Sequence, residues 1–136
     1  MIVDSSAIVA IWDEEPSKRA LSQVLLDAGG AKMSAATYVE MGVVIDNRSR
    51  PERSRSLDSM LRAFGIEVVP FTPSQAVIAR AAYRDFGKGS GHPAHLNMGD
   101  CFSYALASEM DEPLLFVGDD FTHTDVRAAW RPEARP

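Results

Sequence analysis

The chain opens with Met1-Ile2-Val3-Asp4-Ser5-Ser6-Ala7-Ile8-Val9-Ala10-Ile11-Trp12. Residues 2–3 are a short apolar run that predicts a buried strand, and residues 5–12 carry apolar side chains at helical spacing. Asp4 lies between them, where the predicted strand ends. Because open α/β sheets bind ligands beyond the carboxyl ends of their strands, Asp4 is a candidate site residue.

The rest of the chain repeats this alternation of strand and helix. Further strands are predicted at 31–33, 66–69 and 113–117, and further helices at 18–28, 35–47, 51–64, 73–86 and 99–110. Gly29 ends one of these helices and Pro51 begins another. We therefore predict an α/β fold, a three-layer α/β/α sandwich around a mostly parallel sheet. A single domain is expected over residues 1–131, followed by a flexible tail at 132–136.

The composition is that of an ordinary soluble domain. A chain of 136 residues is long enough to bury a core without disulfide or metal support. The single cysteine, Cys101, excludes an internal disulfide and fits a reducing compartment. No apolar run approaches the length of a membrane span, and Met1 leads directly into the first strand without a signal peptide. A cytoplasmic protein without membrane contact is expected.

Four further acids are placed at the same predicted edge as Asp4. Asp119 and Asp120 follow the last predicted strand, and Asp100 lies in the first turn of the last long helix. Glu40 stands on an otherwise small or apolar face of the helix that follows the second strand, where an acid without a partner is rare. Each acid alone could be a helix cap, a dipole partner or a turn residue. Their convergence favours a shared site.

Several carboxylates in one pocket predict a divalent cation. Like charges a few ångströms apart raise each other's pKa, and a hard cation relieves this repulsion. Ligation by oxygen alone suits Mg²⁺ or Mn²⁺, which can activate water for attack on a phosphoryl group. The formal net charge of −5 argues against nucleic-acid binding. Setting the five acids aside leaves 14 acidic residues against 14 basic ones, so this objection disappears.

Two basic groups offer a path for a phosphate backbone. Arg48 and Arg50 follow the helix that carries Glu40, and Arg84 and Lys88 precede a glycine-rich loop. These four side chains are candidate RNA contacts. Solvated helix faces are the commoner explanation for such groups.

Other chemistries are disfavoured by what accompanies their residues. Cys101 lies beside Phe102, as on a packed helix face, which argues against a nucleophile. His92 and His95 lack the thiolates that usually complete a structural zinc site. A phosphatase that uses an aspartyl nucleophile needs a second Asp where Ser6 stands, and a receiver domain has its acidic pair after the first strand rather than the last.

With these residues in view, the chain resembles PIN-domain proteins, specifically the VapC-type toxins of toxin–antitoxin pairs. The resemblance runs from the first residues to about Arg127. The matching stretches are IVDSSA at 2–7, SAATYVE at 34–40, LNMGDCFSYALA at 96–107 and PLLFVGDDF at 113–121.

The resemblance implies an endoribonuclease that depends on Mg²⁺, with Mn²⁺ able to substitute. It implies metal-site acids at Asp4, Glu40, Asp100 and one of the pair Asp119 and Asp120, between which the sequence does not choose. Ser5 matches a position close to the metal, and Asn97 is a plausible support for the metal ligands.

The resemblance also implies partners: RNA as substrate, a second copy of the chain in a homodimer, and a cognate VapB-type antitoxin in a heterotetramer or larger assembly. In the family the antitoxin tail enters the catalytic groove. The alternative is a catalytically silent PIN-like module that binds RNA or protein.

Overall fold

The computed structural model describes residues 1–134, and residues 135–136 are not described. In chain order the elements are β1 (Ile2–Val3), α1 (Ser5–Trp12), α2 (Lys18–Ala28), β2 (Ala31–Ser34), α3 (Ala35–Arg48), α4 (Pro51–Ser54), α5 (Ser56–Ala63), β3 (Ile66–Val69), α6 (Pro73–Phe86), α7 (Met98–Met110), β4 (Leu114–Leu115) and the 3-10 helix η1 (Asp120–His123). No helix in this described range is both long and apolar enough to cross a membrane.

The four strands form one parallel sheet in the order β3-β2-β1-β4. Ile2 of β1 stands opposite Lys32 of β2 on one side and Leu114 of β4 on the other. The Asp4 N–H extends this ladder by one step, because it donates to the Leu115 carbonyl at 2.9 Å. The first strand is therefore held between β2 and β4, and all four strands end at one edge of the sheet, which we call the carboxyl edge.

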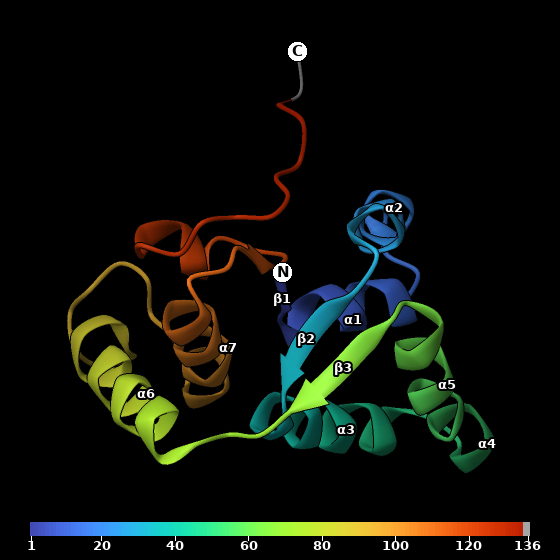
Figure 1. The fold of residues 1–136 in the computed structure, drawn as a ribbon, viewed down its shortest axis with the longest axis horizontal. Helices are drawn as coiled ribbons and strands as arrows, with labels where there is room; N and C mark the ends of the chain where they lie inside the picture. Colours follow the sequence, from blue (N-terminus) through green and yellow to red (C-terminus); the bar gives the residue numbers. More distant parts are fainter. Residues whose placement is uncertain (135–136) are drawn as a thin grey trace.

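Helices cover both faces of the sheet. Successive strand residues point to opposite sides, so Ile2 and Leu114 pack against α6, α7 and η1, whereas Val3 and Leu115 pack against α1, α2, α3 and α5. Figure 1 shows α6 and α7 side by side on one side of the strands and the earlier helices on the other. The predicted three-layer α/β/α sandwich is confirmed.

Three segments differ from the prediction by more than one residue at an end. The helix expected at 51–64 is interrupted after Ser54, giving α4 and α5. The last strand is confined to Leu114–Leu115 because the Val117 N–H leaves the sheet ladder and donates to Ser6 Oγ at 3.1 Å. The segment after η1, expected to be a short helix or irregular, returns to β4. There Leu114 donates to the Arg127 carbonyl at 2.8 Å and accepts from the Ala129 N–H at 2.9 Å.

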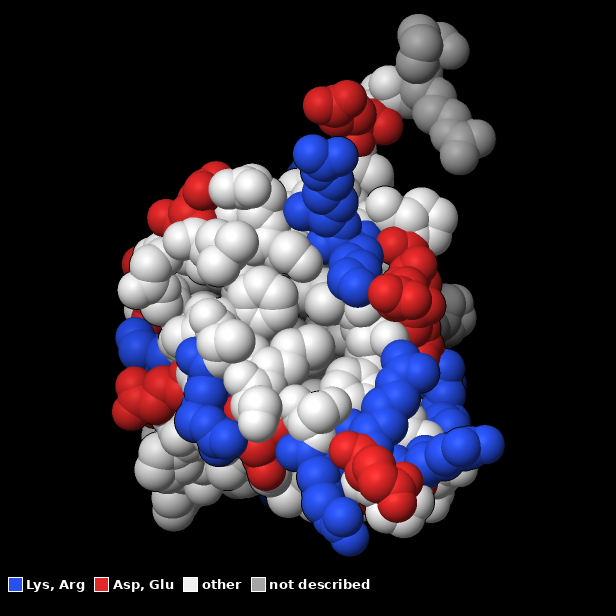
Figure 2. Space-filling view, turned by 90° about the vertical axis from the view of Figure 1, so that its right-hand side faces the viewer, with Lys and Arg blue, Asp and Glu red and all other residues white. Residues whose placement is uncertain are grey.

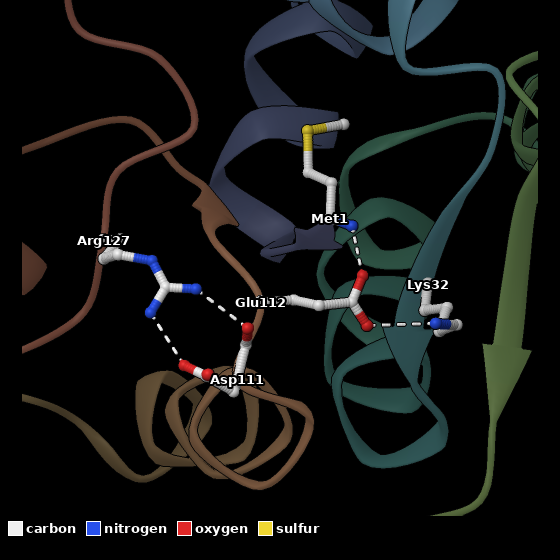
Figure 3. Close-up of polar contacts among 5 residues, drawn as sticks. All are labelled: Met1, Lys32, Asp111, Glu112 and Arg127. Carbon is white, nitrogen blue, oxygen red and sulfur yellow. Dashed lines mark hydrogen bonds and ion pairs between the residues drawn. The ribbon is translucent and has the colours of Figure 1, made fainter.

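Ion pairs join the strands at the edge opposite the carboxyl edge (Figure 3). The amino group of Met1 donates to Glu112 at 2.5 Å, and Lys32 pairs with the other oxygen of the same carboxylate at 3.0 Å. Beside them Arg127 pairs with Asp111 at 2.7 Å. These contacts tie β1, β2 and the turn before β4 together, and the hydrogen bonds from the Met1 amino group and Lys32 lower the pKa of the Glu112 carboxyl.

The domain boundary at residue 131 stays a prediction. Residues 132–134 are exposed and, with the segment before them, extend away from the sandwich (Figure 1). The rest of the predicted tail, residues 135–136, lies outside the described residues.

Candidate active site

Asp4 is a buried carboxylate at the carboxyl edge. Its side chain is only 2% exposed. Oδ2 accepts a hydrogen bond from the Ser6 N–H at 3.0 Å and so caps α1, while Oδ1 accepts from the Ser103 hydroxyl at 2.5 Å. Asp4 is therefore both the cap of α1 and a candidate site acid, because in the capping conformation its carboxylate also faces α7.

A buried hydroxyl pair holds Asp4 from the side of α3 and α7. Ser103 lies within 3.3 Å of the Thr37 hydroxyl, and both residues are fully enclosed. Sequence reasoning missed both as site residues. The available signal was spacing: Thr37 lies three residues before Glu40, and Ser103 lies three residues after Asp100, so each shares a helix face with an acid.

Asp100 is the third residue of α7 and forms a reciprocal capping box with Asn97. The Asn97 N–H donates to Asp100 Oδ2 at 3.0 Å, and the Asp100 N–H donates to Asn97 Oδ1 at 2.8 Å. Burial raises the pKa of the Asp100 carboxyl to about 7, although the hydrogen bond from Asn97 opposes the rise. The charges of three other acids raise this pKa further; they are Asp4, Asp120 and Glu40.

Glu40 extends from α3 to the first turn of α7. It is half-buried, and burial, followed by the charge of Asp4, raises the pKa of its carboxyl. Its two carboxylate oxygens lie directly over Gly99. Glu40 thus joins Asp4 and Asp100 at the carboxyl edge from a different element of the fold.

The two acids of the last turn are placed differently. Both are exposed, but the charge of Asp120 is among those that raise the pKa of Asp100, and that of Asp119 is not. Asp119 instead lines a cavity of about 500 Å³ together with Trp130 and Arg131. We call Asp4, Glu40, Asp100 and Asp120 the acid cluster.

The chemistry of the acid cluster fits a divalent cation. The donors are carboxylate oxygens, and within residues 1–134 no Lys, Arg or His forms an ion pair with any of the four. The other acids raise the pKa of Asp100, and Asp4 raises that of Glu40, so a hard cation would relieve the repulsion among these charges. In the described chain no group of three His, Cys, Asp or Glu side chains stands close enough to hold a metal ion without rearrangement.

Ser5 and Asn97 both lie next to the acid cluster in the chain. Ser5 is the first residue of α1, directly after Asp4, and is half-buried. Asn97 is exposed and fixes Asp100 through the capping box. The roles of Ser5 and Asn97 beside a metal stay predictions.

The four predicted RNA contacts fall into two kinds. Arg48 pairs with Asp13 at 2.6 Å, and Arg84 pairs with its neighbour Asp85 at 2.9 Å. Arg50 and Lys88 are exposed, and within the described residues neither forms an ion pair. All four remain predictions as RNA contacts.

The structure offers no support for cysteine or zinc chemistry in residues 1–134. Cys101 is buried, and burial raises the pKa of its thiol to about 12, which suppresses the thiolate. His92 accepts from the Ala94 N–H at 3.1 Å and packs edge-on against Phe86. His92 is therefore engaged in organising its loop.

Comparison with known proteins identifies the family. The model of the PIN domain matches residues 1–127. Ribonuclease VapC42 of Mycobacterium tuberculosis is 53% identical over 129 residues, which cover 95% of this chain and 98% of the relative. Ribonuclease VapC of Mycolicibacterium smegmatis is 44% identical over 94% of this chain and 98% of the relative.

A solved structure agrees on the fold. A chain of a toxin–antitoxin complex from Klebsiella pneumoniae superimposes with a TM-score of 0.69 over 96% of this chain and 98% of that one, at 15% identity. A likeness at this identity concerns the fold, whereas the relatives at 44–53% identity concern the sequence itself. The chain therefore belongs to the PIN-domain family and, within it, to the ribonucleases named VapC.

Proposed function

We propose that this chain is a divalent-metal-dependent endoribonuclease and the toxin of a toxin–antitoxin pair, acting in the cytoplasm. The observation that carries the proposal is the acid cluster. Its four carboxylates come from the end of β1, α3, α7 and η1, and within residues 1–134 none of them has a basic partner. Relatives that match nearly the whole chain are named as ribonucleases.

Asp4, Asp100, Glu40 and one acid of the last turn would hold Mg²⁺, or Mn²⁺ in its place. A bound cation of this kind activates water and stabilises negative charge on a phosphoryl group. Glu40, whose pKa is raised above its ordinary value by burial and by the charge of Asp4, is suited to accept the proton of the attacking water. Ser103 and Asn97 hold two of the acids in place, which limits the reorganisation needed during the reaction.

Cleavage of RNA by the purified chain tests this function. We expect fragments from total RNA in the presence of Mg²⁺ or Mn²⁺ and none with EDTA. If intact RNA is recovered under every metal condition, including after removal of any co-purified antitoxin, the silent binding module becomes the better account. Retention of RNA on the immobilised protein would then identify that module.

Substitution of each acid of the last turn tests which of the two belongs to the metal site. We propose Asp120 as the fourth site acid, because its charge acts on Asp100. Asp120→Asn should lower cleavage about tenfold or more, whereas Asp119→Asn should change it by less than about threefold. Initial rates on one labelled RNA at saturating Mn²⁺ measure both variants. A larger loss from Asp119→Asn would assign the role to Asp119.

An antitoxin partner is proposed for the face shown in Figure 2. The centre of this face is hollowed and uncharged, and Lys and Arg side chains stand around its margin together with Asp and Glu. On this side of the molecule α2 exposes Leu26, and Met60 and Phe64 of α5 are only partly buried. A VapB-type segment would cover the apolar hollow, and a basic side chain at its end would be attracted to the acid cluster.

A homodimer is proposed through the exposed apolar side chains of α3, α6 and α7. Val39 and Val43 on α3, Val77 and Tyr83 on α6 and Met98 on α7 are all exposed. Met98 of α7 and Tyr83 of α6 are neighbours, since both line one cavity. This cavity of about 530 Å³ lies between α6 and α7 and is also lined by Phe71 and Phe102.

A pair of matched substitutions tests the two faces. Val77 is 71% exposed and Leu26 is 59% exposed, so an Asp at either position should leave the isolated fold intact. Val77→Asp should convert a dimer to a monomer in sedimentation experiments, and Leu26→Asp should not. Leu26→Asp should weaken antitoxin binding, and Val77→Asp should leave it unchanged. A wild-type protein that sediments as a monomer at micromolar concentration would contradict the dimer.

A further inference from the structure

Gly99 is a buried glycine at the second position of α7. Glycine is the poorest helix former after proline, so its use inside a helix calls for a reason. Backbone conformation is not that reason, because Gly99 is not among the glycines with positive φ, which include Gly29 and Gly65. The reason has to lie in the space around its Cα.

That space is occupied by the carboxylate of Glu40. A Cβ at position 99 would lie 1.7 Å from Oε2 and 2.2 Å from both Oε1 and Cδ of Glu40. All three nearest atoms thus belong to the end of one side chain. Any residue other than glycine would have to displace Glu40 to fit.

We propose that Gly99 is a positioning residue: the absence of a side chain there admits the Glu40 carboxylate to the acid cluster. The inference rests on the proposed function for its catalytic consequence, and on the contact with Gly99 for its physical basis. Glu40 is half-buried beside like charges, so a displaced side chain would move toward solvent rather than find another place in the cluster.

Gly42 provides a matched control. It lies on α3, the same helix as Glu40, and a Cβ added there would meet nothing within 4 Å. Gly42→Ala should therefore improve helix propensity without touching the acid cluster. Gly99→Ala makes the same chemical change, but at the position occupied by the carboxylate.

The experiment is a double-mutant cycle in Gly99→Ala and Glu40→Ala, read by Mn²⁺ binding in calorimetry and by thermal unfolding without metal. Gly99→Ala alone should weaken Mn²⁺ binding about tenfold or more. In the Glu40→Ala background the same change should have no further effect on binding and should raise the melting temperature, because the clash is gone and only helix propensity remains. Gly42→Ala should bind Mn²⁺ like wild type.

A rescue variant separates positioning from general damage. Glu40→Asp shortens the side chain, so in the Gly99→Ala background it should recover part of the lost Mn²⁺ affinity. Equal destabilisation by Gly99→Ala with and without Glu40 would overturn the proposal, as would wild-type Mn²⁺ affinity in Gly99→Ala.

Thermal unfolding without metal tests the positioning role of Gly99 independently of the proposed function. If the wild-type chain neither binds Mn²⁺ nor cuts RNA, the proposed function fails. Coupling between positions 99 and 40 in thermal unfolding would still support the steric relation, and additive effects would reject it.

Discussion

Asp4→Asn should reduce RNA cleavage at least about 1,000-fold, because the variant removes the most enclosed charge of the acid cluster. A cation held by carboxylates contributes several kcal/mol of transition-state stabilisation, and each 1.36 kcal/mol corresponds to a factor of ten in rate. Asparagine has the same shape as aspartate, but as a neutral amide it is a weak ligand for a hard cation. The loss should appear in kcat under saturating RNA.

The fold should survive this substitution. The amide oxygen of asparagine can still accept from the Ser6 N–H and so preserve the cap of α1. Circular dichroism and thermal unfolding in EDTA check this point.

Asp111→Asn is the matched control, since it makes the same acid-to-amide change at the opposite edge of the sheet. Asp111 has the left-handed backbone conformation, which asparagine tolerates. Asp111→Asn should cleave like wild type. Wild-type turnover by Asp4→Asn would contradict the proposed site.

Asp100→Asn should make the metal-free protein more stable at neutral pH and remove the stabilisation that metal provides. The folded Asp100 carboxyl keeps its proton up to about pH 7, whereas the unfolded chain releases it near 3.8. Between these values the folded state binds more protons, so this group reduces stability as pH rises from about 4 to 7, and its effect is constant above 7. An amide has no such cost, and its oxygen can still accept from Asn97.

The measurement is the difference between wild type and Asp100→Asn in unfolding free energy at several pH values in EDTA. A difference is needed because carboxyls with lowered pKa, such as Glu112, favour the fold as pH rises through the acidic range. The advantage of the variant should grow from pH 4 to 7 and then level off. Added Mn²⁺ should raise the melting temperature of wild type only, and more at pH 7 than at pH 5, where the proton competes with the metal. A difference that is flat across this range would contradict the prediction.

Local chemistry was sufficient to predict most of the elements. The bounds of α1 and α2 are those predicted, because their ends are marked by Asp4, which caps the first, and by Gly29 in the left-handed conformation at the end of the second. The predicted convergence of acids at one sheet edge follows from the parallel alternation of strands and helices. The structure accordingly brings Asp4, Glu40 and Asp100 into electrostatic contact.

What local chemistry could not predict depends on contacts between distant residues. Ser103 reaches Asp4 across 99 residues of sequence, and the end of β4 is set by a bond from Val117 to Ser6, 111 residues away. The reason for a glycine at position 99 could not be predicted either, because it depends on a carboxylate from another helix. The choice between Asp119 and Asp120 likewise depends on which side chain the turn directs toward α7.

The placement of β1 between β2 and β4 has a consequence for the synthesis of a protein that would harm its own cell. Asp4 leaves the ribosome before the other acids of the cluster, yet one side of its strand has no partner until Leu114 and Leu115 follow. Asp100, Asp120 and β4 all come late in the chain. A nascent or truncated product therefore lacks one strand of the sheet and part of the acid cluster. If the acid cluster is the active site, as proposed, the order of the strands delays activity until translation has passed the last of these segments.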